Sequence, residues 1–448
     1  MYRTRRLALL VVLLLAAVVT AARPSPGQSA DPPIVFVHGN GDTAALWHTI
    51  IWRFESNGYP RDRLLANDLK FPSARSVDAT PQEGRTSAAE AMAQLAAFVD
   101  AALARTGART VALVGNSRGA NTIRNYVRYG GGAARTSHVV LGGGTNHGVI
   151  VSDRHLVGSE FNGAGDLLTR LNGGPDEVVT GVAFMTIRSD TNDKYAQPTG
   201  VFINLPGVPT TVGHDAPALK GATNVVLRGA DHREVSYGPR AFAETYRFIT
   251  GRAPARIDIA GETAPVLDGR VTGIAAGAYD NQPVSGATVE VYAVDPRTGT
   301  RQGEPAHRKT TGADGRWGPF QASPTAAYEF VVSIASLPIT HVYRSPFPRG
   351  SEVIHLRPAI LSGDDQAAAA VVVMTRPRGY FGHGRDVFLL DGAVPDGVTE
   401  GVPAVSIGRV RLADVTARSV PARFNDETIV VRTWPMADRH VAIAEFHY

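Results

Sequence analysis

The 448-residue sequence contains no cysteine, and net charge and long apolar runs are also scarce. Without cysteine the chain can form no disulfide, no thiolate metal site and no thiol nucleophile, so it must hold together by packing. The formal net charge is only +4, and the basic residues, mostly arginine, are scattered rather than gathered into a stripe. This distribution argues against a nucleic-acid partner, which requires a basic patch.

Only one long apolar run is present, and it lies near the N-terminus. Arg3, Arg5 and Arg6 precede an uninterrupted apolar run at 7–19, and small residues and a proline-containing polar stretch follow it. The run is shorter than the roughly 20 residues that cross a bilayer. The pattern therefore predicts a signal peptide and leader over residues 1–30 rather than a stable transmembrane anchor, and hence a secreted, extracellular bacterial protein.

From residue 31 to 252, short apolar runs alternate with stretches of helical spacing. This alternation predicts an α/β fold with a doubly wound, mostly parallel sheet covered by helices. The segments at 146–177 and 200–221 are both longer and less regular than a simple crossover, and both are candidates for a lid or cap, with a lid insertion expected at about 146–177. Strands are expected at 34–37, 110–114, 138–141, 181–187 and 224–227, and helices at 87–106, 119–129 and 241–250.

After residue 252 the helical spacing disappears, and short runs rich in Val, Thr and Tyr alternate with Gly, Pro and Asp turns. Such a pattern is typical of all-β structure. We expect a β-sandwich domain at 254–357 and a second β-rich unit at 358–448. Strands are expected at 287–292, 328–334, 352–356, 371–374 and 429–433.

A serine lies in a G-x-S-x-G motif, Gly115-Asn116-Ser117-Arg118-Gly119, between an expected strand and an expected helix. This context is that of a nucleophile elbow, a strained turn that presents a serine hydroxyl above a sheet. The turn requires small flanking residues, and Gly115 and Gly119 meet that demand. We therefore predict that Ser117 is a catalytic nucleophile.

A serine hydroxyl is protonated at neutral pH and needs a general base to attack. His232 follows the last strand expected in the α/β region, which places it on a loop at the carboxyl edge of the sheet. An acid must in turn orient the imidazole. Asp190 and Asp193 both follow the strand expected at 181–187, and both qualify.

Acyl transfer also needs donors for the developing oxyanion, each worth about 3 kcal/mol. The backbone amide of Arg118, directly after the serine, is one candidate. The loop after the first strand contains His38-Gly39-Asn40-Gly41, an H-G-x-G element that makes the Asn40 amide the other. We expect His38 to be a structural residue beneath this loop.

Together these segments resemble the lipase and esterase branch of the α/β-hydrolases, including extracellular bacterial lipases and the fungal lipase-B type. The resemblance covers residues 33–251 and rests on segments 37–41, 115–119, 145–148, 168–172 with Glu177, 193–198 and 231–232. It implies an α/β-hydrolase fold with Ser117, Asp193 and His232 as a catalytic triad. The amides of Asn40 and Arg118 are implied as the oxyanion hole.

Within this resemblance Asp193 is favoured over Asp190, because segment 193–198 is similar to the one that follows the acid in many lipases. Asn116 departs from the family, in which histidine is common before the nucleophile, and this leaves the subfamily open. The appended β region also resembles that of some archaeal lipases, on architecture alone.

These observations favour a secreted serine carboxylic-ester hydrolase, most simply a lipase that acts on lipid or ester substrates through an acyl-enzyme. A lipid–water or polymer interface is the place where we expect such substrates. A polyester depolymerase is an alternative, and a non-catalytic secreted binding protein on a hydrolase fold is another. The chemistry requires neither a cofactor nor a metal, although related lipases often hold a structural calcium. The sequence leaves chain-length preference and oligomeric state open.

Overall fold

The computed structural model describes residues 31–448, so the signal peptide and leader expected at 1–30 lie outside the described residues. Residues 32–448 form one unit. Between residues 31 and 448, no helix is both long and apolar enough to cross a membrane.

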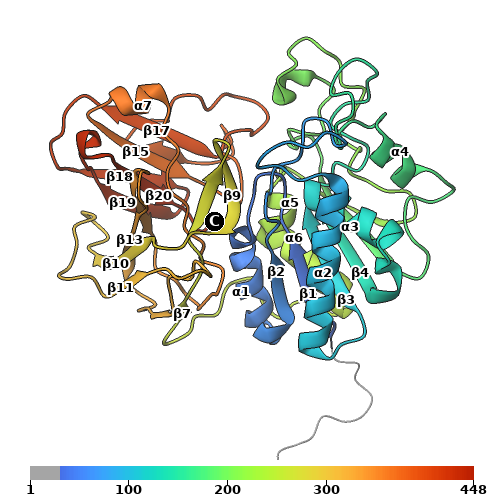
Figure 1. Ribbon diagram of the computed structural model, residues 1–448, viewed down its shortest axis with the longest axis horizontal. Coiled ribbons are helices and arrows are strands. Elements are labelled where there is room, and N and C mark those ends of the chain that lie inside the picture. Colours follow the sequence, from blue (N-terminus) through green and yellow to red (C-terminus); the bar gives the residue numbers. More distant parts are fainter. Residues whose placement is uncertain (1–30) are drawn as a thin grey trace, which may run out of the picture. The chain divides into compact units, whose positions relative to one another are not determined.

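A parallel sheet of six strands forms the centre of the N-terminal half, in the order β2-β1-β3-β4-β5-β6 (Figure 1). The chain switches direction across the sheet at β1, because β2 lies on one side of it and β3 on the other. In open sheets of this type, ligands bind outside the carboxyl ends of the strands near such a switch. The strands are β1 Ile34–Val37, β2 Leu64–Asn67, β3 Val111–Asn116, β4 Thr136–Gly142, β5 Ala183–Ser189 and β6 Thr223–Leu227.

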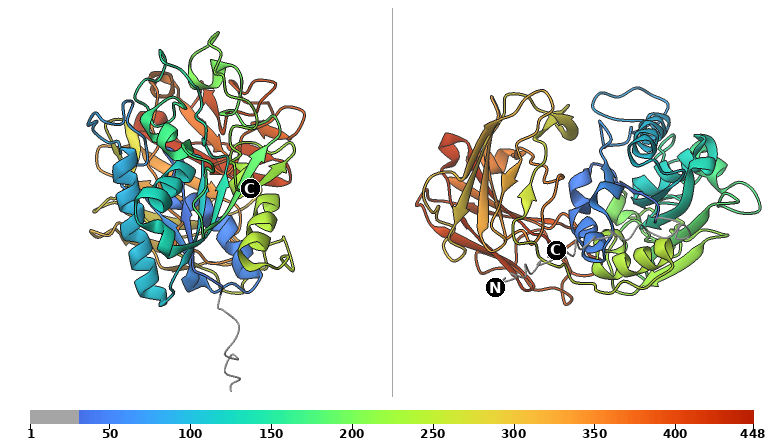
Figure 2. Two further views of the ribbon diagram at one scale, coloured as in Figure 1. Left: turned by 90° about the vertical axis from the view of Figure 1, so that its right-hand side faces the viewer. Right: turned by 90° about the horizontal axis from the view of Figure 1, so that it is seen from below.

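Helices cover both faces of this sheet, as Figure 2 shows. One face packs against α1 and α6 through Phe54 and Phe242, and the other against α2 and α3 through Leu95 and Ile123. The predicted doubly wound α/β arrangement is therefore confirmed. The helices are α1 His48–Ser56, α2 Ala88–Thr106, α3 Arg118–Tyr129, α4 Asp166–Asn172, α5 Glu234–Tyr237 and α6 Pro239–Thr250.

Local sequence explains where α2 begins and ends and why α1 has no clear signal. Ser87 and Glu90 form a reciprocal capping box at the start of α2, and Gly107 ends it in the left-handed conformation at φ 65°. In contrast, α1 is buried continuously from His48 to Phe54. A helix that is buried on all sides lacks the clear amphipathic spacing by which helices are recognised in a sequence.

The segment expected as a lid, 146–177, contains only the short helix α4 and is tied to α3 by arginines. Arg124 donates to the Leu171 carbonyl at 3.2 Å, and Arg128 donates to the Gly173 carbonyl at 3.1 Å. The segment is thus largely irregular, as the sequence indicated, and hydrogen bonds anchor its C-terminal end to α3.

The C-terminal half contains a seven-stranded mixed sheet in the order β11-β10-β13-β14-β20-β15-β17. Here β20 pairs in parallel with both β14 and β15, so one sheet joins strands from both sides of residue 357. The boundary expected between 254–357 and 358–448 therefore runs through this sheet. Smaller sheets pair β7 with β12, β8 with β9, and β18 with β16 and β19.

The strands of this half confirm the predicted all-β region, which holds one short helix, α7 Gly363–Ala367. They are β7 Val266–Leu267, β8 Thr272–Ala275, β9 Ala278–Pro283, β10 Thr288–Val294, β11 His307–Thr310, β12 Phe320–Gln321, β13 Ala327–Ser333, β14 Ile339–Arg344, β15 Ala370–Thr375, β16 Phe388–Leu390, β17 Ile407–Leu412, β18 Ser419–Phe424, β19 Glu427–Arg432 and β20 His440–Glu445.

The prediction of a strand at 352–356 is wrong. This stretch forms only isolated bridges, between Ser351 and Leu267 and between Leu356 and Val271. A bend at Glu352 separates these two bridges. The segment therefore lies beside another part of the chain without forming a regular strand.

The two halves share buried side chains. Trp52 of α1 is fully buried in a cluster that includes Leu267 and Trp317 of the β region, and its indole donates to the Gly350 carbonyl at 2.8 Å. Asp68, just after β2, bonds His355 at 2.9 Å. The β region is thus packed against the α/β region through both apolar and charged contacts.

Candidate active site

Ser117 lies in the turn between β3 and α3, at φ 53° and ψ −120°. A positive φ is strained for a residue with a side chain, and such strain is common at functional sites. The flanking glycines are required by space: a Cβ on Gly115 would lie 2.6 Å from Ile123 Cδ1, and one on Gly119 would lie 2.5 Å from the Val37 carbonyl oxygen. The turn has the geometry of a nucleophile elbow.

His232 and Asp193 meet at the carboxyl edge of the sheet, on the loops after β6 and β5. His232 Nδ1 lies 2.8 Å from Asp193 Oδ1, and both side chains are buried. The same oxygen accepts the Tyr195 amide at 2.9 Å, and the Tyr195 ring packs edge-on to the imidazole at 4.7 Å. Because Nδ1 faces the carboxylate, Nε2 is the nitrogen left to take up a proton.

Asp190 does not contact the imidazole, and its carboxylate bonds to backbone amides of its own loop and of the loop after β6. Its carboxylate accepts the Thr191 amide at 2.8 Å and the Gly229 amide at 3.0 Å. Burial acts to raise the pKa of Asp190, but these hydrogen bonds outweigh it and hold the pKa below its ordinary value. The structure therefore brings Asp193, and not Asp190, to the histidine.

The serine turn and the histidine loop are joined by Asn116. Its side-chain amide donates to the His232 carbonyl at 3.2 Å and to Ser236 Oγ at 2.9 Å. Within the described residues, His232 Nε2 has no hydrogen-bond partner, so the bond from the Ser117 hydroxyl is not formed in this state. Catalytic hydrogen bonds are often long or open before substrate binds and tighten afterwards.

Both groups are also shielded from solvent, with Ser117 8% and His232 2% exposed.

The two expected oxyanion donors lie in well-anchored backbone. The Arg118 amide begins α3, where the first N–H groups have no partner within the helix. The Asn40 loop is held by its side chain, which accepts the Ala74 amide at 2.7 Å, and by the Gly41 amide, which donates to Pro72 at 3.1 Å.

His38 lies fully buried beneath the same loop. Its Nε2 accepts the Leu69 amide at 3.1 Å, which leaves Nδ1 to donate to the Gly39 carbonyl at 2.8 Å. Burial lowers the pKa of the imidazole, which favours this neutral form. His38 thus occupies the place expected of a structural residue.

The side chain of Arg118 links the elbow to the segment expected as a lid. It is fully buried and makes a two-pronged ion pair with Glu160, at 2.8 Å for each bond. It also donates to Pro72, the residue that anchors Gly41. Burial raises the pKa of Glu160, although Arg118 opposes that rise.

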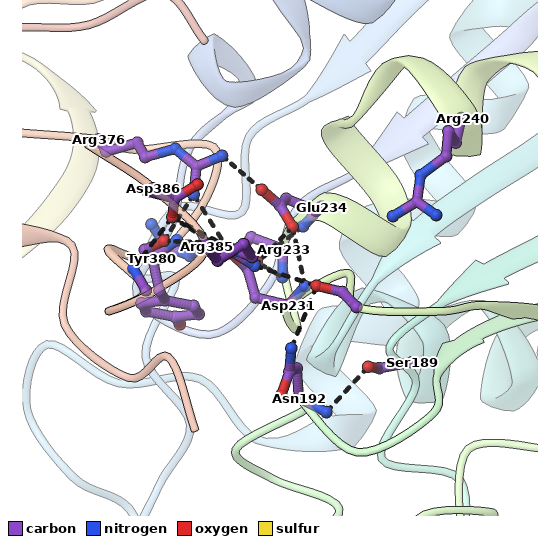
Figure 3. A network of polar contacts seen from close by, with 12 residues as sticks. Ser189, Asn192, Asp231, Arg233, Glu234, Arg240, Arg376, Tyr380, Arg385 and Asp386 are labelled. Carbon is purple, nitrogen blue, oxygen red and sulfur yellow. Dashed lines mark hydrogen bonds and ion pairs between the residues drawn. The ribbon is translucent and has the colours of Figure 1, made fainter. Parts of the chain in front are cut away.

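Several residues around the site were not identified from the sequence. Tyr195 packs on the imidazole, and Asn116 was noted only as a departure from the family pattern. Arg376 and Arg385 reach from the β region to Asp231 and Glu234, which flank His232 (Figure 3). No pattern marks these two arginines, because arginine is common and scattered throughout the chain.

Comparisons with solved structures find lipases and esterases of low similarity. A lipase B from Aspergillus fumigatus is 16% identical, with a TM-score of 0.36, over 52% of this chain and 55% of that one. The mature lipase BlEst2 from Bacillus licheniformis is 19% identical, with a TM-score of 0.37, over 50% of this chain and 94% of that one. Its propeptide form is 15% identical, with a TM-score of 0.36, over 91% and 94%. This chain thus spans about half the length of the fungal enzyme.

Two family models match the sequence. Residues 31–156, which include the serine turn and the Asn40 loop, match lipase (class 2). Residues 266–360, in the β region, match the lipase C-terminal domain. Residues 31–156 are therefore similar to class 2 lipases and residues 266–360 to lipase C-terminal domains, and the first of these segments contributes β1, β2, β3 and β4 to the parallel sheet.

Proposed function

We propose that the protein is a lipase that cleaves carboxylic esters through a covalent serine intermediate, with Ser117, His232 and Asp193 as the triad. The observation that carries this proposal is the buried 2.8 Å bond between His232 Nδ1 and Asp193 Oδ1, on loops beside the strained serine turn. A histidine with one nitrogen on a carboxylate and the other unpartnered is arranged to act as a general base.

In this mechanism Ser117 Oγ attacks the ester carbonyl carbon while His232 Nε2 removes the hydroxyl proton. The imidazolium forms beside Asp193, whose charge stabilises it. When the tetrahedral intermediate collapses, the same proton passes to the leaving alcohol. Water, activated by His232, then releases the acid and restores the serine.

The negative charge of both tetrahedral intermediates develops on the former carbonyl oxygen. The Arg118 amide at the start of α3 and the Asn40 amide in the anchored loop are the donors proposed for it. The positive end of the α3 dipole adds to this stabilisation. Because these donors belong to backbone held by other bonds, they need little rearrangement during the reaction.

The test replaces the nucleophile and follows the hydrolysis of p-nitrophenyl esters. Ser117→Ala should abolish turnover and leave the circular dichroism spectrum unchanged. Ser137→Ala is the matched control, because Ser137 lies at the start of β4 and bonds only to nearby groups, including the Val111 carbonyl at 3.2 Å. Undiminished turnover in Ser117→Ala would refute the proposal.

The substrate class proposed is a lipid ester, on the strength of the class 2 lipase match. An acyl series from short to long p-nitrophenyl esters, together with a triacylglycerol emulsion, tests it. We expect hydrolysis of the emulsion, whereas turnover confined to short soluble esters would indicate an esterase. A polyester film tested in parallel identifies a depolymerase.

We also propose that the protein is exported. Three arginines followed by the apolar run at 7–19 support this, and both lie outside the described residues. N-terminal sequencing of protein collected from the culture medium tests the proposal. The expected result is a chain that begins after the apolar run, and retention of the full chain inside the cell would contradict it.

A further inference from the structure

The turn that follows His232 is fixed by the two carboxylates that flank the histidine. Asp231 Oδ1 accepts the amides of Arg233 and Glu234, at 2.8 and 2.9 Å. Glu234 Oε2 in return accepts the Asp231 amide at 2.9 Å. The position of the imidazole therefore depends on where these two carboxylates are held.

Two arginines of the β region hold both carboxylates from outside (Figure 3). Arg376 Nη1 and Arg385 Nη2 each donate to Asp231 Oδ2 at 3.2 Å. Arg376 Nη2 donates to Glu234 Oε1 at 2.5 Å, and Arg385 Nη1 donates to Glu234 Oε2 at 2.9 Å. Each arginine thus bridges both acids, and we call these four side chains the arginine clamp.

The backbone around the clamp adds to the same attachment. The Tyr380 amide donates to Asp231 Oδ2 at 2.7 Å, and its carbonyl accepts both Arg376 and Arg385. Arg233 donates to the Pro377 carbonyl at 2.5 Å and to Asp42, two residues after Asn40, at 2.6 Å. Contacts from residues 376–385 therefore reach the neighbours on both sides of His232.

Burial makes this arrangement depend on charge. Asp231 is 0% exposed and Arg376 is 5% exposed. Burial acts to raise the pKa of Asp231, but Arg376, Arg385 and the amides of Tyr380 and Glu234 outweigh it and keep the pKa below its ordinary value. If one arginine is removed, the buried Asp231 carboxylate keeps only one of its two counter-charges, so its charged form and its position become less favourable.

We propose that Arg376 and Arg385 are positioning residues for the catalytic base, and that the C-terminal lipase domain thereby completes the active site of the N-terminal one. The inference rests on the proposed function, because it treats His232 as the base. Neither arginine contacts the imidazole. They act by fixing the turn after His232, while Asn116 holds the His232 carbonyl from the serine side.

The main test compares Arg376→Met with wild type in the full-length protein. A displaced base stabilises the transition state less well but leaves ester binding intact. We therefore expect kcat to fall about 10- to 100-fold while KM stays within about 2-fold. Arg376→Lys restores the charge without the planar fork and should recover part of the loss. Arg418→Met is the matched control, because Arg418 pairs with Asp391 at 2.6 Å within the β region.

A readout independent of turnover is the proton resonance of His232 Nδ1, assigned by its loss in His232→Ala. We expect Arg376→Met to shift or broaden this resonance and Arg418→Met to leave it unchanged. A folded Arg376→Met variant with wild-type kcat and an unchanged resonance would overturn the proposal. If that variant does not fold, Arg376→Lys and Glu234→Gln replace it, and wild-type kcat in both would also overturn it.

Failure of the proposed function looks different. Wild-type turnover in Ser117→Ala would refute the serine mechanism whatever the arginine variants do. Ser117-dependent turnover at the wild-type rate in Arg376→Met, even with a shifted His232 resonance, would overturn the positioning role and leave the serine mechanism intact.

Discussion

At the scale of residues, hydrogen bonds to neighbouring groups fix the position of each carboxylate in the candidate site. Asp193 Oδ1 accepts both His232 and the Tyr195 amide, while Asp190 accepts the Thr191 amide of its own loop and the Gly229 amide of the loop after β6. These two carboxylates lie three positions apart, yet they have separate tasks. One orients the imidazole, and the other stabilises the loop that carries the first.

Substitution of each carboxylate by its amide separates these tasks. Asp193→Asn should lower kcat by about 10,000-fold with the fold intact, because an amide can hold the wrong tautomer and cannot stabilise the imidazolium. Asp190→Asn should leave kcat within about twofold and reduce the free energy of unfolding by about 1 kcal/mol, because its hydrogen bonds lose their charge. Steady-state kinetics and urea unfolding of both variants provide the measurements. Equal losses of kcat would contradict the assignment.

Much of the site could be predicted because parallel strands bring their carboxyl ends to one edge. Ser117, Asp193 and His232 each follow an apolar strand, and that placement is visible in the sequence. The choice between Asp190 and Asp193 depends on loop geometry that no periodicity encodes. The contact between Arg376 and Asp231 joins positions 145 residues apart, and nothing local in either segment indicates its partner.

At the scale of elements, the β3–α3 turn is the most constrained part of the fold. Gly119 packs directly against the backbone of the Asn40 loop: a Cβ there would lie 2.5 Å from the Val37 oxygen and 2.7 Å from the His38 oxygen. The serine turn and the loop that carries Asn40, the proposed second oxyanion donor, are therefore packed against each other. The sequence indicated small residues here, but not the neighbour that demands them.

A methyl group at this contact should affect both stability and turnover. Gly119→Ala pushes α3 away from the loop after β1, so we expect a loss of about 1–3 kcal/mol in the free energy of unfolding and a large fall in kcat. Gly363→Ala, where an added Cβ meets no atom within 4 Å, is the control and should change neither by much. Thermal melts and ester assays suffice, and a fully active Gly119→Ala would show that the contact is unimportant.

At the scale of the whole molecule, the β region is bound to the α/β region through shared packing and charge. Trp52 lies within the core of the β region, and the arginine clamp joins the β region to the loop that carries His232. The sequence predicted both regions but placed a boundary at 357 through a single sheet, because strand order cannot be read from local pattern. Removal of residues 254–448 would therefore expose Trp52 and leave Asp231 and Glu234 without the arginines that pair with them.

Acid should weaken the junction between the two regions. Burial alone would raise the pKa of Asp68, but His355, His38 and the Ala44 amide outweigh it and lower the pKa. The pKa of an aspartate side chain in an unfolded chain is about 3.9. The charged Asp68 carboxylate therefore stabilises the fold above that pH, and this stabilisation is lost as the pH falls below it.

The free energy of unfolding should therefore fall more steeply in wild type than in Asp68→Asn between about pH 4 and pH 2. Denaturant titrations across that range provide the measurement. Asp153→Asn is the control, because the Asp153 side chain is 89% exposed. Parallel curves for wild type and Asp68→Asn would show that this ion pair does not contribute.

The role of Ser117 is tested by reacting the intact protein with a fluorophosphonate and mapping the adduct by mass spectrometry. We expect a single adduct on Ser117, formed rapidly in wild type and much more slowly in His232→Ala. An adduct on another residue, or a rate that is the same with and without the histidine, would contradict it.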